Sequence, residues 1–285
     1  MTRQPRQISI EGAPLMGAGM HADVYRLDDE TVVKAYRPFV TMESIEREKK
    51  LSKWAFVKGL PTAISFDIVK AGDRDGIVYE LINARSVSEY IKESDANFDI
   101  FIRKYVDLME QIHSVEVMPG ELPDMKQQAL GWIATCREYL NSEVCDRLVP
   151  VVESLPDSHT LLHADYHIGN ILVCGDELML IDMDTLCAGD PLFELSSIYN
   201  SYVEFPGIDS KAAEILGLDC RTARKRWDKT LELYTAGDKQ KAAQIEKKSL
   251  ILGCMRIIDV MNRHKEHPGF NSVVSVCTKD ISENI

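Results

Sequence analysis

Three side chains that carry oxygen follow one another in the middle of this chain of 285 residues. Asp165 is followed by Asn170 five residues later and by Asp182 twelve residues after that, with a largely apolar stretch between them. A carboxylate set against a hydroxyl can accept its proton while the oxygen attacks phosphorus. Amide and carboxylate oxygens are also the ligands that Mg²⁺ prefers. The spacing therefore makes Asp165 a candidate catalytic base, and Asn170 and Asp182 candidate metal ligands.

A glycine-rich segment near the N-terminus is the first candidate for contacting phosphate. Gly17 and Gly19 lie between two expected strands, where small residues let backbone N–H groups approach phosphate oxygens closely. The alternative is an ordinary hairpin turn. The order strand, turn, strand argues against a dinucleotide-binding fold, in which a helix follows the glycines, and the sequence contains no Walker motif.

Lys34 is the second candidate for contacting phosphate. It stands in a Val-Val-Lys-Ala stretch, where a buried ammonium group without a partner would be costly. The functional hypothesis is that it contacts nucleotide phosphates and pairs with a carboxylate of the next helix. Glu48 is the predicted partner, with Glu46 and Glu43 as alternatives. The simpler interpretation is that Lys34 lies on the solvent face of an edge strand.

The elements that must position these residues begin with a part rich in strands. Three strands are expected within residues 8–36, followed by a helix over about 41–58. Two more strands are expected at about 63–70 and 76–82. Together they predict a five-stranded antiparallel sheet with one helix.

The last of these strands leads into a linker between two predicted lobes. A linker of this kind can offer backbone C=O and N–H groups to the edge of an adenine ring, and Glu80 and Ile82 are the predicted carriers. A plain connection is the alternative. The predicted division is an N-terminal, nucleotide-binding lobe of residues 1–82 and a C-terminal lobe of residues 83–285 with the catalytic loop and the acceptor site.

Helical periodicity dominates the C-terminal part, so the predicted fold class is α+β with a mostly helical C-terminal lobe. A short β ribbon, 170–174 paired with 177–181, interrupts the helices at the central residues. The last twenty residues, after Pro268, are weakly patterned. The helices are expected at about 86–93, 98–115, 124–149, 192–203, 209–216, 220–235 and 238–265.

The composition excludes several classes of protein. The net charge of −12 repels phosphate backbones, so no nucleic-acid partner is expected. The sequence contains neither the apolar core of a signal peptide nor an apolar run long enough to span a membrane. The seven cysteines never form a C-x-x-C pair and indicate reduced thiols in a cytoplasmic protein. No obligate protein partner is implied.

A zinc site is the competing interpretation of the central stretch, because His163 and His167 have the spacing of two zinc ligands on a helix. Gly169 and the expected preceding strand make a helix improbable at this point. Ala164 also stands where a zinc protease has its glutamate. We therefore expect His163 to hydrogen-bond the backbone and hold the loop.

Three stretches, taken in order, resemble the signature of the aminoglycoside phosphotransferase and choline kinase superfamily, which are small-molecule relatives of protein kinases. They are His163-x-Asp165-x-x-x-x-Asn170, Ile181-Asp182-x-Asp184 and Gly189-Asp190-Pro191-x-x-Glu194-Leu195. The resemblance implies a bilobal, protein-kinase-like fold that uses ATP (or GTP) and Mg²⁺. It implies that Asp165 is the base, that Asn170 and Asp182 bind the metal and that Lys34 binds phosphates. Ile168 replaces a frequent proline and Glu194 an aspartate.

The resemblance implies transfer of the γ-phosphate to a hydroxyl of a small molecule: an aminoglycoside, choline or ethanolamine, another amino alcohol or a sugar. Ala164 and His167 replace the arginine and lysine of a protein kinase, and residues 182–190 leave no room for a long activation segment. The alternative function is a non-catalytic, nucleotide-binding regulator on the same scaffold. Such regulators usually lack the base, the lysine or a metal ligand, and all of these are present here.

The sequence offers two sets of residues for the acceptor site and does not choose between their possible roles. One set of polar residues could either meet a cationic acceptor or serve as helix caps and packing. A basic cluster could meet a phosphorylated acceptor, but it is expected to be a solvated helix face. The first set is Asp190, Glu194, Tyr199, Tyr202 and Glu204, and the second is Arg221, Arg224, Lys225, Arg226 and Lys229.

Overall fold

The computed structural model of this chain describes residues 5–285, and residues 1–4 of the predicted N-terminal lobe lie outside the described part. The described chain folds into two compact units. The first is made of residues 5–86 and Asn170–Thr185, and the second of Val87–Gly169 and Leu186–Ile285. The predicted division lay between residues 82 and 83 only, and it did not include a later segment in the N-terminal part.

The first unit is built on a sheet in which six strands of the described chain lie in the order β1-β5-β6-β4-β3-β2. Neighbouring strands are antiparallel except β1 and β5, which run parallel. The sheet has one strand more than the five predicted, because Gly12, at φ 73°, makes a turn between Ile10 and Ala13 that divides the first expected strand. The strands are β1 (Arg6–Ile8), β2 (Leu15–Ala18), β3 (Ala22–Arg26), β4 (Thr31–Tyr36), β5 (Ser65–Ala71) and β6 (Arg74–Glu80).

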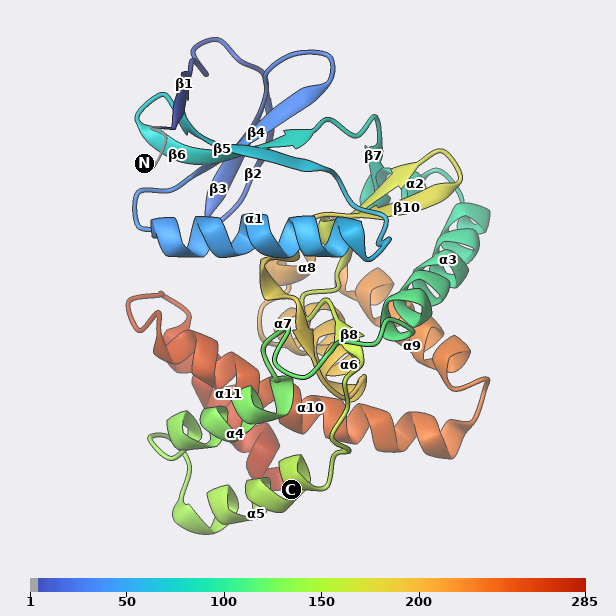
Figure 1. The fold of residues 1–285 in the computed structure, drawn as a ribbon. Helices are drawn as coiled ribbons and strands as arrows, with labels where there is room; N and C mark the ends of the chain where they lie inside the picture. Colours follow the sequence, from blue (N-terminus) through green and yellow to red (C-terminus); the bar gives the residue numbers. More distant parts are fainter. Residues whose placement is uncertain (1–4) are drawn as a thin grey trace. The chain divides into compact units, whose positions relative to one another are not determined.

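Helix α1 (Met42–Val57) lies along this sheet and contacts β5 and β6 (Figure 1). Thr41 caps its N-terminus, since the hydroxyl accepts a hydrogen bond from the N–H of Ser44. The helix buries one face, which includes the polar residue Glu48. The helix predicted over residues 41–58 is therefore confirmed.

A smaller sheet of the first unit carries the central segment of the sequence. β7 (Arg85–Ser86) pairs with β9 (Ile171–Cys174), and β9 pairs with β10 (Glu177–Leu180). The N–H of Leu180 donates to the carbonyl of Pro61 at 2.7 Å, which joins this ribbon to the segment that precedes β5. The predicted ribbon is thus confirmed, and it belongs to the first unit.

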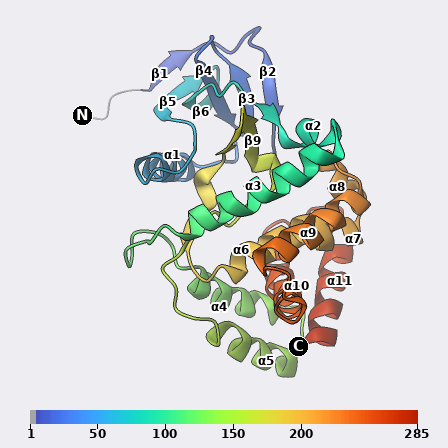
Figure 2. The same cartoon turned by 90° about the vertical axis from the view of Figure 1, so that its right-hand side faces the viewer.

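The second unit is mostly helical, and α10 lies at its centre in contact with α4, α6, α9 and α11. Helices α3 and α9 run side by side (Figure 2). Two short strands, β8 (Leu161–Leu162) and β11 (Cys187–Ala188), pair antiparallel. The helices are α2 (Val87–Lys92), α3 (Asp95–His113), α4 (Met125–Cys136), α5 (Ser142–Glu153), α6 (Leu192–Tyr199), the π-helix η3 (Asn200–Glu204), α7 (Phe205–Ile208), α8 (Lys211–Ile215), α9 (Cys220–Tyr234), α10 (Lys239–Asn262) and α11 (Phe270–Asn284).

Two helical expectations for this unit need correction. The single helix predicted over 124–149 is two helices, because the chain turns after Cys136 and Asn141 caps α5 by accepting a hydrogen bond from the N–H of Val144. The weakly patterned C-terminal residues form α11. This helix buries Val273, Val274, Cys277 and Ile281, whose spacing is that of one helix face.

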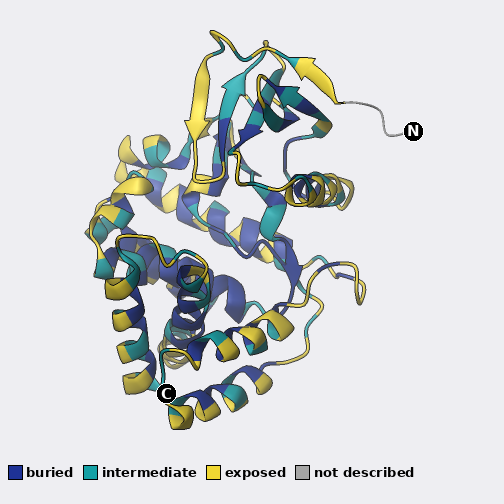
Figure 3. Cartoon of the chain, turned by 90° about the vertical axis from the view of Figure 1, so that its left-hand side faces the viewer, coloured by how far each residue is buried: buried dark blue, intermediate teal, exposed yellow. Residues whose placement is uncertain are grey.

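The two edge strands of the main sheet are exposed, and β2 exposes the apolar residues Leu15 and Met16. Exposed residues follow β1 and β2, the two edge strands of the main sheet (Figure 3). Among residues 5–285 no helix combines the length and the apolar character that crossing a bilayer requires.

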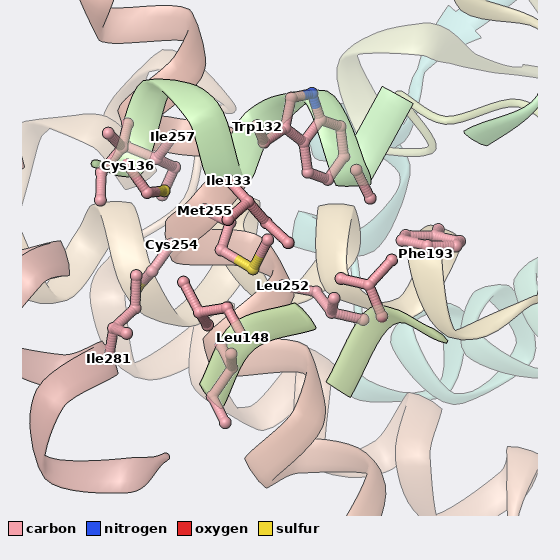
Figure 4. Close-up of a cluster of buried hydrophobic side chains, with 14 of the residues drawn as sticks. Trp132, Ile133, Cys136, Leu148, Phe193, Leu252, Cys254, Met255, Ile257 and Ile281 are labelled. Atoms are coloured by element: carbon pink, nitrogen blue, oxygen red, sulfur yellow. The ribbon is translucent and has the colours of Figure 1, made fainter. Parts of the chain in front are cut away.

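An apolar core of the second unit collects around α10 (Figure 4). Leu252 is fully buried in it. Replacement by alanine is expected to lower the free energy of unfolding by about 2–5 kcal/mol, because it leaves a cavity that the neighbouring helices fill only in part. Chemical denaturation followed by circular dichroism measures this loss.

The matched control is Val260→Ala on the same helix, where the side chain is 41% exposed. This change should cost less than about 0.5 kcal/mol. Equal losses for the two variants would contradict the burial of α10.

Candidate functional site

In the first unit, Lys34 is held by two carboxylates. Its Nζ atom donates to Oε1 of Glu48 at 2.8 Å and to Oδ1 of Asp182 at 2.7 Å. The side chain of Lys34 is 16% exposed and that of Glu48 is 5% exposed. Burial by itself would lower the pKa of Lys34, but the charges of Asp182 and Glu48 outweigh it and raise the pKa, so the ammonium group stays charged. The predicted pairing of Lys34 with Glu48 is present, and Asp182 is a second partner.

Tyr79 extends this network and was not identified from the sequence. Its hydroxyl donates to Oε1 of Glu48 at 3.1 Å and lies 3.3 Å from the hydroxyl of Ser52. Burial, with the charge of Glu48, raises the pKa of Tyr79, so the phenol stays neutral and acts as a donor. The donors from Lys34 and Tyr79 together fix the position of the Glu48 carboxylate.

Asp182 has a backbone conformation that an L-residue rarely adopts, with φ at 65°. Such conformations cost about 1–3 kcal/mol and persist where surrounding contacts hold them. Carboxylate oxygens of Glu48, Asp182 and Asp184 lie within 4.8 Å of one another. Oxygen is the donor type that suits a hard divalent cation such as Mg²⁺. The structure thus brings Asp182 to an oxygen-rich cluster in the first unit.

Asn170, the other predicted metal ligand, lies at the start of the ribbon and is buried. Its carbonyl accepts a hydrogen bond from the N–H of Ile181 at 3.0 Å. This bond sets Asn170 beside the chain that leads directly into Asp182. The two predicted metal ligands therefore lie just before and just after one β ribbon of the first unit, although eleven residues separate them.

The glycine segment joins β2 to β3. The N–H of Gly19 donates to the carbonyl of Ala22 at 2.8 Å, and Gly17 pairs with Val24. A Cβ atom at Gly17 would meet no protein atom within 4 Å, so packing within the described chain does not require glycine there. The space beside Gly17 is open to a ligand.

Glu80 and Ile82, the predicted adenine contacts, differ in whether their backbone groups are already bonded within the sheet. The N–H of Glu80 donates to the carbonyl of Ile64 at 2.9 Å, and the Glu80 side chain accepts from the N–H of Ile64 at 3.3 Å. The N–H of Glu80 is therefore committed to the sheet. Ile82 lies just beyond the end of β6 and is half-buried.

In the second unit, Asp165 follows a strained turn. Ala164 has φ at 63°, and its carbonyl accepts hydrogen bonds from the hydroxyl of Ser197 at 3.1 Å and from the guanidinium group of Arg256. These donors come from α6 and α10. They hold the conformation that presents Asp165, because relaxing Ala164 would break both bonds.

His163 and Glu194 support the same turn. Glu194 is fully buried, and its Oε2 atom accepts the N–H of His163 at 2.7 Å. Nδ1 of His163 accepts the N–H of Asp165 at 3.3 Å, as expected for a histidine that holds the loop. The longer side chain of Glu194, whose role was open, therefore anchors the backbone two residues before the base.

His167 lies beside the Asp165 carboxylate, with Nε2 3.4 Å from Oδ2. Its Nδ1 atom accepts the N–H of Gly169 at 3.1 Å, so Nε2 carries the ring proton and faces the carboxylate. Burial would raise the pKa of Asp165, but the hydrogen bond from His167 and the positive charge of Arg256 outweigh it and lower the pKa. Asp165 is therefore ionised at neutral pH.

The zinc interpretation gains no support from these contacts. In both His163 and His167 the Nδ1 atom accepts a backbone N–H. Neither histidine belongs to a group of three metal-ligating side chains within residues 5–285.

Aromatic side chains form hydrogen bonds with the rest of the loop after Asp165, and they were not identified from the sequence. The N–H of Ile168 donates to the hydroxyl of Tyr202 at 2.8 Å. Tyr105 and Tyr166 donate to each other's carbonyls at 2.8 and 2.7 Å. The loop is thus bonded to α3 on one side and to the π-helix on the other.

Arg226 packs against these rings rather than facing solvent. Its guanidinium carbon lies 4.3 Å from the ring centre of Tyr105, 4.8 Å from that of Tyr202 and 4.5 Å from that of Phe101. The residue is fully buried, so its assignment to a solvated helix face is wrong. The available signal was its position three residues after Ala223, on the buried stripe of α9.

The residues considered for an acceptor mostly serve the protein interior. Glu194, Tyr199, Tyr202 and Glu204 are all buried. Asp190 accepts the N–H of Leu192 at 2.8 Å at the start of α6. Of the two interpretations, the structure supports caps and packing.

Solved structures with the same fold are enzymes of phosphoryl transfer. The GDP and kanamycin complex of APH(2")-IIia has 13% sequence identity and a TM-score of 0.62, over 98% of this chain and 95% of that one. Amicoumacin kinase hAmiN in complex with AMP-PNP, Ca²⁺ and Ami has 18% identity and a TM-score of 0.60, over 98% and 90%. The streptomycin–ATP ternary complex of APH(2")-IIa has 18% identity and a TM-score of 0.57, over 87% and 84%. At this identity they show the kinase-like α+β fold.

No curated protein sequence matches this chain significantly. The family profile described as the phosphotransferase enzyme family matches residues 14–228, which include the glycine segment, Lys34 and the central stretch. The chain therefore belongs to the phosphotransferase enzyme family.

Proposed function

We propose that this chain is a kinase that transfers the γ-phosphoryl group of ATP, or of GTP, to a hydroxyl of a small molecule with the help of Mg²⁺. The observation that carries the proposal is the bonding of Lys34 to both Glu48 and Asp182 in the first unit. It fits the arrangement in which a lysine contacts phosphates while an aspartate binds their metal ion.

In the first unit, Lys34 would contact nucleotide phosphates, and Gly17 and Gly19 would let the backbone approach them. Asp182 and Asn170 would hold the metal ion. When bound, Mg²⁺ neutralises charge on phosphate oxygens and orients the transferred group. Oδ1 of Asp182 accepts from Lys34, so in this proposal its other oxygen faces the ion.

In the second unit, Asp165 would accept the proton of the acceptor hydroxyl. Its lowered pKa keeps it ionised and makes it a weak base. A weak base suffices where the transition state is loose. The bond from phosphorus to the leaving oxygen is then largely broken before the acceptor hydroxyl has to lose its proton. The main work of Asp165 is then to orient the hydroxyl, with His167 holding the carboxylate.

The acceptor proposed here is a small, hydroxylated molecule, with aminoglycosides, choline, ethanolamine, other amino alcohols and sugars as the classes to test. The net charge of −12 favours a cationic member of this set and disfavours nucleic acid. We place the reaction in the cytoplasm, where ATP is supplied and the free cysteines stay reduced, with no membrane and no obligate protein partner.

Asp165→Asn tests the base. The turnover number should fall by about 10²–10⁴-fold, because an amide cannot accept the proton, while nucleotide affinity stays within twofold (about 0.4 kcal/mol). Phosphorylation of a metabolite panel, read by mass spectrometry of the product, first identifies the acceptor and then gives kcat. Asp146→Asn, an exposed exchange in the same unit, is the control. A near-native kcat for Asp165→Asn would refute the base, and no ATP consumption by the unaltered protein on any acceptor would favour a non-catalytic regulator.

Asp182→Ala tests the metal ligand. Calorimetry with and without Mg²⁺ should show that the Mg²⁺-dependent part of nucleotide binding is lost, because a carboxylate ligand has been removed. Asp176→Ala, in the turn of the same ribbon, should keep it. Unchanged Mg²⁺ dependence in Asp182→Ala would contradict the assignment.

Tyr202→Phe tests whether the loop bond matters to the reaction. Removing the hydroxyl leaves the N–H of Ile168 without its acceptor, a loss of about 1–3 kcal/mol. We expect kcat to fall about tenfold while KM for the nucleotide is unchanged, since Tyr202 belongs to the unit that carries the base. A variant that melts earlier but keeps its kcat would show that this bond serves stability alone.

A further inference from the structure

We propose that Glu204, Cys254 and Cys277 form a binding site for a zinc ion in the second unit. This site is independent of the proposed kinase function. The residues come from separate elements, since Glu204 ends the π-helix η3, Cys254 lies on α10 and Cys277 on α11. One ligand atom from each lies within 4.8 Å of the other two.

The spacing of these atoms suits a tetrahedral ion. Sγ of Cys254 lies 3.5 Å from Oε1 of Glu204. Zinc binds sulfur at about 2.3 Å and carboxylate oxygen at about 2.0–2.2 Å, so the S···O edge of a tetrahedral site is roughly 3.5 Å. Two thiolates and a carboxylate are also a donor set that selects zinc over Mg²⁺.

The surroundings of Glu204 call for positive charge. The residue is 6% exposed, and within residues 5–285 no basic side chain forms an ion pair with it. A second carboxyl group, that of Asp280, lies beside it. A dication at this point would compensate the carboxylate and the two thiolates, and its binding would release their protons.

The π-helix supplies an independent observation. Widened turns of this kind are rare and occur often at functional sites. Asn200, at its start, is 5% exposed, and its Oδ1 atom has no hydrogen-bond donor among the described residues. Its Nδ2 atom donates to the carbonyl of Gly253, the residue just before Cys254. The Oδ1 atom packs against Gly253, so Asn200 joins the π-helix that carries Glu204 to the residue before Cys254.

Asp280 lies three residues after Cys277 on α11, and its carboxyl group interacts with that of Glu204, but it is not one of the three clustered ligands. A water molecule would complete the tetrahedron. An ion held by the three residues would join the π-helix, α10 and α11.

Titration of the full chain with Co²⁺, in reducing buffer with Mg²⁺ in excess, tests the site. Mg²⁺ saturates the oxygen ligands, so a thiolate-to-cobalt charge-transfer band reports sulfur ligation alone. We expect the band to reach its limit at one Co²⁺ per chain, to disappear when Zn²⁺ is added, and to accompany a rise in melting temperature of several degrees.

Cys254→Ser and Cys277→Ser should each remove most of the band. Cys145→Ser, another buried thiol of the same unit, should keep it. Glu204→Gln preserves side-chain volume and a hydrogen-bonding group, and should weaken Co²⁺ binding by more than about tenfold. This variant guards against the case in which a cysteine replacement fails to fold.

Three results would overturn the proposal. One is the absence of any charge-transfer band in the unaltered, reduced protein. Another is a band that survives in Cys254→Ser. The third is a mass lower by two hydrogens that marks a Cys254–Cys277 disulfide in protein purified without reductant, together with no metal uptake after reduction. If Glu204→Gln raises the melting temperature and metal has no effect on either protein, the cluster is a thiol–carboxyl contact of the core.

Discussion

The ion pairs of Lys34 are the constraint on which the first unit depends. An ammonium group that is only 16% exposed cannot lose a carboxylate partner without a large cost in free energy. Its partners lie 14 and 148 residues away in the sequence. β4, α1 and the segment after β10 must therefore meet, and this requirement explains why residues 170–185 fold with the N-terminal part rather than with the helices that surround them in the sequence.

Strained backbone is a second constraint, and neutral and charged hydrogen bonds compensate for it. Ala164 and Asp182 are both non-glycine residues with positive φ, and they stand one residue before the proposed base and at a proposed metal ligand. Each conformation costs about 1–3 kcal/mol in isolation. Ser197 and Arg256 compensate at the first position, and Lys34 at the second. At these two of the three non-glycine residues with positive φ among residues 5–285, strain and its compensation occur beside assigned chemistry, whereas the third, Ala236, follows the end of α9.

Local sequence patterns predicted the features that depend on neighbouring residues. They failed for the features that depend on residues distant in the sequence. The helix over residues 41–58 and the central ribbon followed from short-range signals. The parallel pairing of β1 with β5 could not be predicted, because no residue near β1 in the sequence indicates which strand it pairs with. Arg226 was misassigned because a run of basic residues indicates a solvated face, whereas tertiary packing placed this one guanidinium group among aromatic rings. The geometry of Lys34 and Glu48 was predictable, because a charge in a buried strand requires an opposite charge nearby.

The acceptor stays undetermined for a physical reason. The polar residues closest in sequence to the central stretch are consumed in holding the loop: Glu194 binds the backbone of His163, and Tyr202 binds that of Ile168. A side chain that is buried and already bonded cannot also recognise a ligand. Recognition of the acceptor must then rest on more exposed groups, whose identity has little effect on folding. The fold can therefore persist while the acceptor changes, which is why solved structures at 13–18% identity show the fold and not the acceptor.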